Sequence, residues 1–149
     1  MKRLRQSVIA FAATILLLSC ASAPPTGGVR DSLQALLPLL EESRFREFKA
    51  GFVAARDGFA ALPDSTGKQA LEPAMTALSD LNVAWSERSR GRTCYPRTEH
   101  QAFVAKYPDY RKSVTEWKAK AQCPPELRSS EALFFFLLSE SRRRIEAVR

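Results

Sequence analysis

Residues able to carry out chemistry are scarce in this chain. It has three cysteines and a single histidine, His100. A Ser–His–acid arrangement would have to use His100, but no serine stands in a G-x-S-x-G motif. The 16 Asp and Glu residues are scattered over polar stretches, so the sequence pairs no two of them for acid–base catalysis. We therefore expect no enzymatic activity.

The sequence gives equally little basis for a cofactor or a metal. Covalent haem attachment needs C-x-x-C-H, which the chain lacks. Non-covalent haem ligation would have to use Met75 with His100, and a buried methionine that fills a core is the simpler interpretation. Cys94 and Cys123 with one histidine are too few ligands for a structural zinc site. We expect no cofactor and no metal.

The first 20 residues resemble a bacterial lipoprotein signal peptide. Residues 2–5 contain two arginines and a lysine, and Val8 to Leu18 form an apolar stretch. This stretch is too short to cross a bilayer as a permanent helix. It ends in Leu17-Leu18-Ser19-Cys20, which has the residue types and the order of a lipobox.

The resemblance implies how the chain is processed and where it resides. Cleavage would follow Ser19, and Cys20 would be diacylated on sulfur. Ala21 follows the cysteine in place of the Asp typical of inner-membrane retention, which implies the periplasmic face of the outer membrane. The predicted organisation is a signal peptide at 1–19, a Ser/Ala/Pro/Gly-rich tether at 20–30 and a single helical domain at 31–149.

An export compartment permits disulfides, and Cys94 and Cys123 remain once Cys20 carries lipid. We predict a Cys94–Cys123 bridge that closes a loop of roughly 30 residues, worth about 3–4 kcal/mol in the chain-entropy model. The alternative is two separate thiols.

Helical spacing of apolar residues runs through the domain, and strand-type alternation does not occur, so we predict an all-α bundle. Asp31 or Ser32 is expected to cap a first helix reaching Leu40, which Pro38 kinks or splits. The stretch from Phe45 to Leu62 has apolar residues in alternating steps of three and four, which predicts a long amphipathic helix.

Two further helical regions are predicted in the middle of the chain. One starts near Pro73 and carries a stripe ending at Trp85, after which Ser86 to Arg97 indicate a loop. The other starts at Thr98, which forms a capping-box pattern with Gln101.

Pro108 is expected to break this third helical region. An unbroken helix from Thr98 to Ala121 would be about 36 Å long and would keep Cys94 and Cys123 beyond disulfide reach. The last helix is predicted to run from Glu126 to about Val148, with acidic residues near its start and arginines near its end, as the helix dipole favours.

Two apolar stretches have both a packing and a binding interpretation. Seven apolar residues in succession, from Ala132 to Leu138, cover every side of the last helix. Phe134 and Phe135 therefore either pack beneath Leu33 to Leu40 or form an exposed patch for a partner. The stripe from Phe45 to Phe59 forms core or a groove for an amphipathic helix or an acyl chain.

Four arginines, Arg88, Arg90, Arg92 and Arg97, cluster around Cys94 in the predicted loop. Anionic headgroups, lipopolysaccharide or an acidic protein face would suit them as partners. A solvated loop without a partner is the alternative.

The charge balance limits the kinds of partner. The formal net charge is +7, and it falls to +4 when the three cations of the signal-like segment are removed. This modest excess does not indicate nucleic-acid binding. We expect a lipid-anchored, non-catalytic accessory protein with an envelope protein as partner, similar in size and class to secretin pilot proteins. The alternative is a toxin-neutralising immunity lipoprotein or a lipid-binding periplasmic module.

Overall fold

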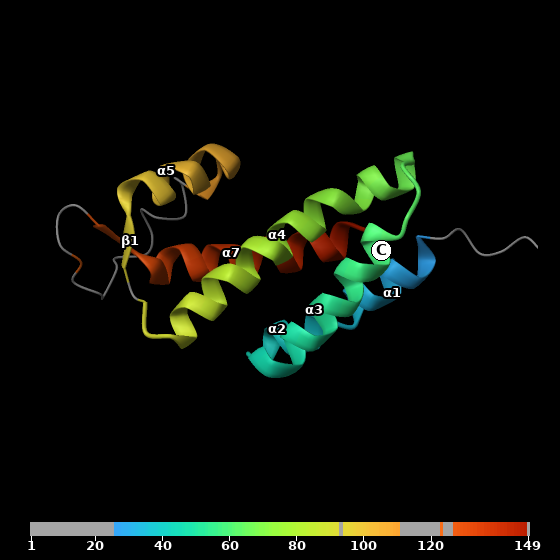
Figure 1. Cartoon of the computed structure of the whole chain (residues 1–149), viewed down its shortest axis with the longest axis horizontal. Coiled ribbons are helices and arrows are strands. Elements are labelled where there is room, and N and C mark those ends of the chain that lie inside the picture. Colours follow the sequence, from blue (N-terminus) through green and yellow to red (C-terminus); the bar gives the residue numbers. More distant parts are fainter. Residues whose placement is uncertain (1–25, 93, 111–122, 124–126, 149) are drawn as a thin grey trace, which may run out of the picture.

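The computed structural model describes residues 26–92, 94–110, 123 and 127–148. They form a helical bundle with one short two-stranded ladder, which confirms the predicted all-α class (Figure 1). The elements are α1 (Gly27–Gln34), α2 (Leu37–Glu41), α3 (Phe45–Ala60), α4 (Thr66–Ser89), β1 (Cys94–Pro96), α5 (Arg97–Lys106), β2 (Leu127–Ser129) and α7 (Ser130–Ala147).

The first helix begins earlier than the sequence indicates. α1 starts at Gly27, so the predicted start at Asp31 or Ser32 is wrong, and residues assigned to the tether are helical. Val29 is 5% exposed and belongs to the core. Its burial outweighs the low helix propensity of the two glycines before it. The split at Pro38 is confirmed, because α1 ends at Gln34 and α2 places Pro38 in its first turn.

The phenylalanine stripe of α3 forms core, as its spacing indicates. Phe48, Phe52 and Ala55 are buried, and Phe45 and Phe59 are partly buried against the same cluster. This side of α3 faces the rest of the bundle, whereas Val53, on its other side, is 38% exposed.

The longest helix, α4, starts and ends beyond its predicted limits. It begins at Thr66 because the Ser65 hydroxyl caps it by accepting a hydrogen bond from the Lys68 amide at 3.2 Å. Pro73 therefore lies inside the helix, on its exposed side. The helix continues through Ser89, so the predicted loop from Ser86 is wrong in its first four residues. Gly91 then adopts a φ of +82°, the left-handed conformation that commonly follows a helix end.

The core is built around the packing of α4 on α7. These two helices make the most extensive contact in the fold, and α1, α2 and α3 cover the rest of it. Trp85 contacts three other aromatic rings in this core, with its ring centroid 5.1 Å from that of Phe45, 5.2 Å from Phe48 and 5.5 Å from Phe134. α7 begins at Ser130, because Leu127–Ser129 pair as a strand in place of the predicted first helical turn.

A small lobe follows α4 and holds the disulfide. β1 pairs antiparallel with β2, and Cys94 lies opposite Ser129. The predicted bridge is present: the Cys94 and Cys123 sulfurs are 2.01 Å apart and their Cα atoms 5.9 Å apart. The sequence analysis missed both strands, since three residues are too few to show alternation.

The break at Pro108 is also confirmed. α5 ends at Lys106, and the chain turns at Pro108 and Asp109. Residues 111–122, including most of the predicted continuation to Trp117, lie outside the described residues. The predicted capping box is wrong, because Pro96 precedes the first residue of α5 and no side chain caps it.

The bundle therefore has two distinct ends, visible in Figure 1. The N-terminal end contains the start of α1, the start of α4 and the end of α7. There a Cβ built on Gly67 would approach Thr26 to 2.9 Å, so the two helix starts are in close contact. The disulfide end contains β1, β2 and α5. α4 joins the two ends over 24 residues, which is about 36 Å of helix.

Candidate functional site

The apolar centre of α7 is core and does not form an exposed patch. Phe134 is 6% exposed, so its predicted role as an exposed partner contact is wrong. Phe135 is partly buried beside it, with the two ring centroids 5.4 Å apart. The burial alternative holds, but the cover comes chiefly from α4, with α1 and α2 contributing less.

Arg88 covers what remains of this aromatic surface. It extends from the last turn of α4, and its guanidinium carbon lies 5.0 Å from the Phe134 ring centroid and 5.6 Å from that of Phe135. These distances are within the range of cation–π attraction. We call Arg88, Phe134 and Phe135 the arginine platform. Sequence spacing did not reveal it, because 46 residues separate Arg88 from Phe134.

Arg92 is held in place by neighbours on three sides. It pairs with Glu87 at 3.1 Å and with Glu99 at 3.1 Å, and its guanidinium carbon lies 4.7 Å from the Tyr95 ring centroid. The hydrogen bond to Glu87 raises the pKa of Arg92, and the same hydrogen bond lowers the pKa of Glu87. Arg92 therefore links the end of α4 to β1 and α5, a structural role that the sequence did not predict.

The other two predicted arginines differ from Arg92. Arg90 reaches Glu87 at 3.1 Å, but its side chain is 74% exposed. Arg97 is the first residue of α5, and its side chain is outside the described part of the structure, as is that of His100. Arg90 and Arg92 thus share Glu87 as a partner, whereas Arg88 lies over the rings of Phe134 and Phe135.

A second polar cluster joins α4, α5 and α7 on the side of the bundle where α5 ends. The Tyr107 hydroxyl donates to Asp80 at 2.5 Å, and Lys106 forms an ion pair with the same carboxylate. The Arg144 guanidinium carbon is 5.2 Å from the Tyr107 ring centroid, and Arg144 also donates to the Pro73 carbonyl at 2.9 Å. This cluster, which we call the tyrosine clasp, fixes the lobe to the bundle.

Burial determines the titration of these groups. Burial, with the hydrogen bond to Asp80, raises the pKa of Tyr107 well above its usual range. Burial alone raises the pKa of Tyr110 to about 12. Burial also acts on Glu140, but its hydrogen bonds to Arg143 and Arg144 outweigh burial and lower the pKa of that carboxyl. None of these shifts brings a proton donor or acceptor close to neutral pH.

The tyrosine clasp gives a testable pH dependence. Because the fold keeps both phenols neutral, stability is full below their ordinary pKa of 10.0 and falls as the pH rises above it. Tyr107→Phe is expected to cost about 1.5–3 kcal/mol at neutral pH, the value of a hydrogen bond to a charged group. Its alkaline loss of stability should also be shallower, since one phenol fewer titrates. Urea denaturation from pH 7 to pH 11 measures both effects.

Lys106→Met is the matched control for this change. It removes the half-exposed ion pair to Asp80 and keeps the phenol, so it is expected to cost less than about 1 kcal/mol. Equal alkaline slopes in wild type and Tyr107→Phe would show that Tyr107 does not contribute to the pH dependence.

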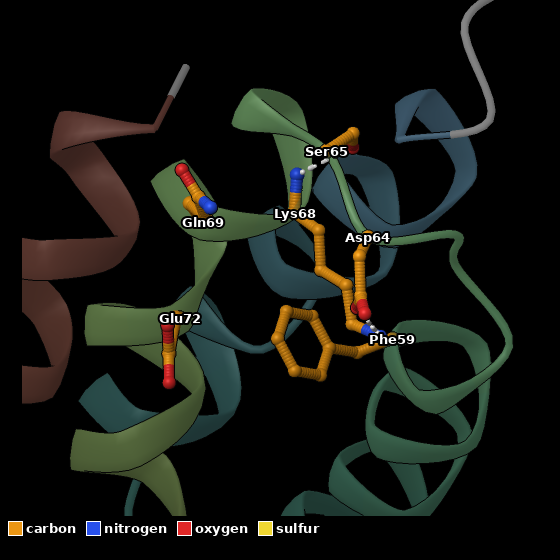
Figure 2. A pocket seen from close by; sticks show the side chains of 6 residues that line it. All are labelled: Phe59, Asp64, Ser65, Lys68, Gln69 and Glu72. Carbon is orange, nitrogen blue, oxygen red and sulfur yellow. Dashed lines mark hydrogen bonds and ion pairs between the residues drawn. The ribbon is translucent and has the colours of Figure 1, made fainter.

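A hollow of about 320 Å³ lies at the N-terminal end, between the end of α3 and the first turns of α4. Figure 2 shows the Lys68 side chain running past the Phe59 ring toward Asp64, with Glu72 on the other side. Lys68 already pairs with Asp64 at 3.2 Å and donates to the Leu62 carbonyl at 2.9 Å. Its charge is therefore satisfied within the protein, and the hollow brings together no groups suited to catalysis.

A second hollow, of about 490 Å³, lies between α4 and the end of α7. It is lined by small apolar residues and by Arg143 and Arg144. Neither hollow is lined by Phe45, Phe52 or Phe135, the residues of the predicted acyl-chain groove. Phe52 stacks on Phe48 with their centroids 6.0 Å apart, as core residues do.

The described part of the structure was expected to lack a metal site, and of the two residues considered for haem ligation only the side chain of Met75 lies within it. Over residues 26–92, 94–110, 123 and 127–148, no three His, Cys, Asp or Glu residues gather so that they could hold a metal ion. Met75 is 6% exposed and belongs to the core. No helix in these ranges is both long and apolar enough to span a membrane.

Comparison with other proteins adds no family to these observations. No protein-family model, no curated protein and no solved structure matches the chain. A functional assignment therefore depends on the motifs of the sequence and on the geometry of the two ends.

Proposed function

We propose that this chain is a lipid-anchored, non-catalytic accessory protein of the bacterial cell envelope. The observation that carries the proposal is the lipobox Leu17-Leu18-Ser19-Cys20 after a short apolar segment. The Cys94–Cys123 disulfide supports it, because such bridges persist in oxidising compartments such as the periplasm.

The position of α1 indicates which end of the bundle a lipid anchor would hold at the membrane. Five residues lie between Cys20 and Thr26, so the chain between these two Cα atoms spans at most about 20 Å. A lipid on Cys20 would thus keep the N-terminal end of the bundle close to the membrane surface. The disulfide end, at the other end of α4, would be the part free to point away from that surface and meet a partner.

Cys20→Ser is the direct test of the anchor. Two acyl chains, each worth about 0.8 kcal/mol per buried CH₂, hold a protein on a membrane without spontaneous release. In bacteria expressing the full chain, wild type is expected almost entirely in the membrane fraction, and Cys20→Ser almost entirely outside it. Mass spectrometry of the N-terminal peptide should find a diacylglyceryl group on the Cys20 sulfur.

The matched control is the double variant Cys94→Ser with Cys123→Ser. It also removes thiol groups but keeps Cys20, so it is expected to remain in the membrane fraction. An unmodified Cys20 in a chain that still fractionates with membranes would overturn the lipid-anchor proposal.

A further inference from the structure

We propose that the arginine platform is the site at which this protein binds a carboxylate-rich face of an envelope protein. This proposal rests on the proposed function, since it names the partner chemistry of the end that would point away from the membrane. It starts from a difference among three neighbouring arginines. Arg90 and Arg92 pair with Glu87, whereas no ion pair or hydrogen bond engages the Arg88 guanidinium in the described structure.

The aromatic rings beneath Arg88 prepare it for a ligand. Phe134 is buried and Phe135 partly buried, so their rings are fixed supports at 5.0 and 5.6 Å from the guanidinium carbon. A guanidinium held over rings loses less conformational freedom when it binds than one that moves freely in water. Its planar fork of N–H donors matches the two oxygens of a carboxylate.

The surroundings of the arginine platform are also rigid. Arg92 ties the end of α4 to Glu99 on α5 and lies over Tyr95 on β1. The disulfide closes the lobe beside it. A partner would therefore meet a surface whose shape is set before binding, which lowers the entropic cost of association.

Charge is distributed unevenly along the sequence in a way that favours an acidic partner. From Arg88 to Arg128 the sequence has ten basic residues (Lys and Arg) and four acidic residues (Asp and Glu). The rest of the chain after Cys20 has ten basic and twelve acidic residues. Three of these cations, Arg88, Arg90 and Arg92, lie within five residues at the disulfide end, in the last turn of α4 and directly after it. An acidic surface approaching this end is attracted before contact.

Position favours a protein over lipid headgroups as the source of the negative charge. Arg88 is in the last turn of α4, and Thr26, which follows the five-residue link after Cys20, contacts the first turn. The length of α4 therefore separates the arginine platform from the point where a lipid anchor would attach.

A direct binding experiment tests this proposal with defined probes. Fluorescence anisotropy of a labelled polyglutamate peptide is measured against the full-length lipidated protein in detergent micelles. Arg88→Ala is expected to weaken peptide binding about tenfold, as expected for loss of a charge-assisted, bidentate contact. Arg88→Lys keeps the charge but loses the planar fork, and it is expected to weaken binding by a smaller factor.

Arg46→Ala is the matched control. Arg46 is an exposed arginine on α3 that likewise forms no ion pair among the described residues, and its removal lowers the net charge equally. It is expected to change peptide affinity less than about twofold. Equal losses in the Arg46 and Arg88 variants would overturn the proposal, because the peptide would then sense only net charge.

A second probe distinguishes the two sources of negative charge. Here the lipid on Cys20 is first inserted into a nanodisc, so that it cannot insert into other membranes. Binding of this protein to vesicles that contain phosphatidylglycerol is then measured. Vesicle binding that depends on Arg88, together with peptide binding that does not, would overturn the protein partner in favour of a headgroup site. Membrane fractionation of the Arg88 variants should equal that of wild type, which separates this proposal from the lipid anchor.

Discussion

Replacing Phe48 with alanine is expected to lower the free energy of unfolding by about 3–5 kcal/mol, the usual cost of removing a buried aromatic ring. Phe48 is 0% exposed, and its ring lies between those of Phe52 and Trp85, with centroids 6.0 and 5.2 Å away. The cavity would open where α3 meets α4, so neither helix can close it without moving the other. A domain of this size has about 5–15 kcal/mol of stability in total, so this single change would remove much of it.

Val53→Ala on the same helix is the matched control. Val53 is 38% exposed, so its truncation is expected to stay within about 0.5 kcal/mol of wild type. Urea denaturation followed by circular dichroism compares the two variants on one scale. A cost for Phe48→Ala no larger than that for Val53→Ala would contradict the placement of Phe48 at the centre of the core.

The sequence predicted those elements whose signals are local or covalent. Steps of three and four from Phe45 to Leu62 are enough to predict α3, since the pattern covers nearly five helical turns. The break at Pro108 followed from a different constraint, because an unbroken helix would have kept Cys94 and Cys123 apart. In the first case the periodicity of apolar residues requires a helix, and in the second the reach of a disulfide requires a break in the helix.

The wrong boundaries arose where burial or capping outweighed a local preference. Pro73 is a common first-turn residue, but the Ser65 hydroxyl caps α4 eight residues earlier and the helix tolerates the proline on its exposed side. Ser65 after Asp64 was a usable capping signal that the proline obscured. Gly27 and Gly28 indicated a tether, yet Val29 behind them packs into the core. The burial of Val29 depends on tertiary contacts, which the local sequence does not reveal.

The candidate site was predictable only in part, because its contacts link distant positions. Sequence proximity groups the four arginines, but the separate contacts of Arg88, Arg90 and Arg92 depend on residues from several elements, and the side chain of Arg97 lies outside the described part of the structure. Arg88 rests on rings from α7, and Arg92 reaches Glu99 on α5. The Tyr107–Asp80 hydrogen bond spans 27 positions and has no sequence signature. Such pairings follow from the packing of α4 on α7 and α5, which composition and periodicity do not specify.

Removing the disulfide is expected to open the lobe while leaving the bundle folded. The bridge joins positions 29 apart, and in the chain-entropy model its loss costs about 3–4 kcal/mol. Most of the core residues belong to α1–α4 and α7, outside the closed stretch. The lobe contributes fewer contacts to that core, chiefly Tyr107 and Tyr110 against Phe136, with centroids 5.6 and 5.2 Å from it. The cost should therefore appear locally.

The double variant Cys94→Ser with Cys123→Ser tests this expectation by hydrogen exchange. Amides of α5 are expected to exchange about a hundredfold faster than in wild type, since 3–4 kcal/mol of local protection is partly offset by the tyrosine clasp. Amides of α3 should be unchanged. A Trp117→Phe background leaves Trp85 as the sole tryptophan, so its fluorescence reports the bundle alone.

Wild type treated with reductant should reproduce the double variant, which separates loss of the bridge from any effect of the serine side chains. Unchanged exchange in α5 would show that the tyrosine clasp and the β1–β2 ladder hold the lobe without the disulfide. Equal acceleration in α3 and α5 would show instead that lobe and bundle unfold as one unit. If only the lobe opens, Arg92 loses Glu99 and Tyr95 while Arg88 keeps its support on α7. The peptide affinity of the reduced protein then measures how far the arginine platform depends on a rigid neighbour.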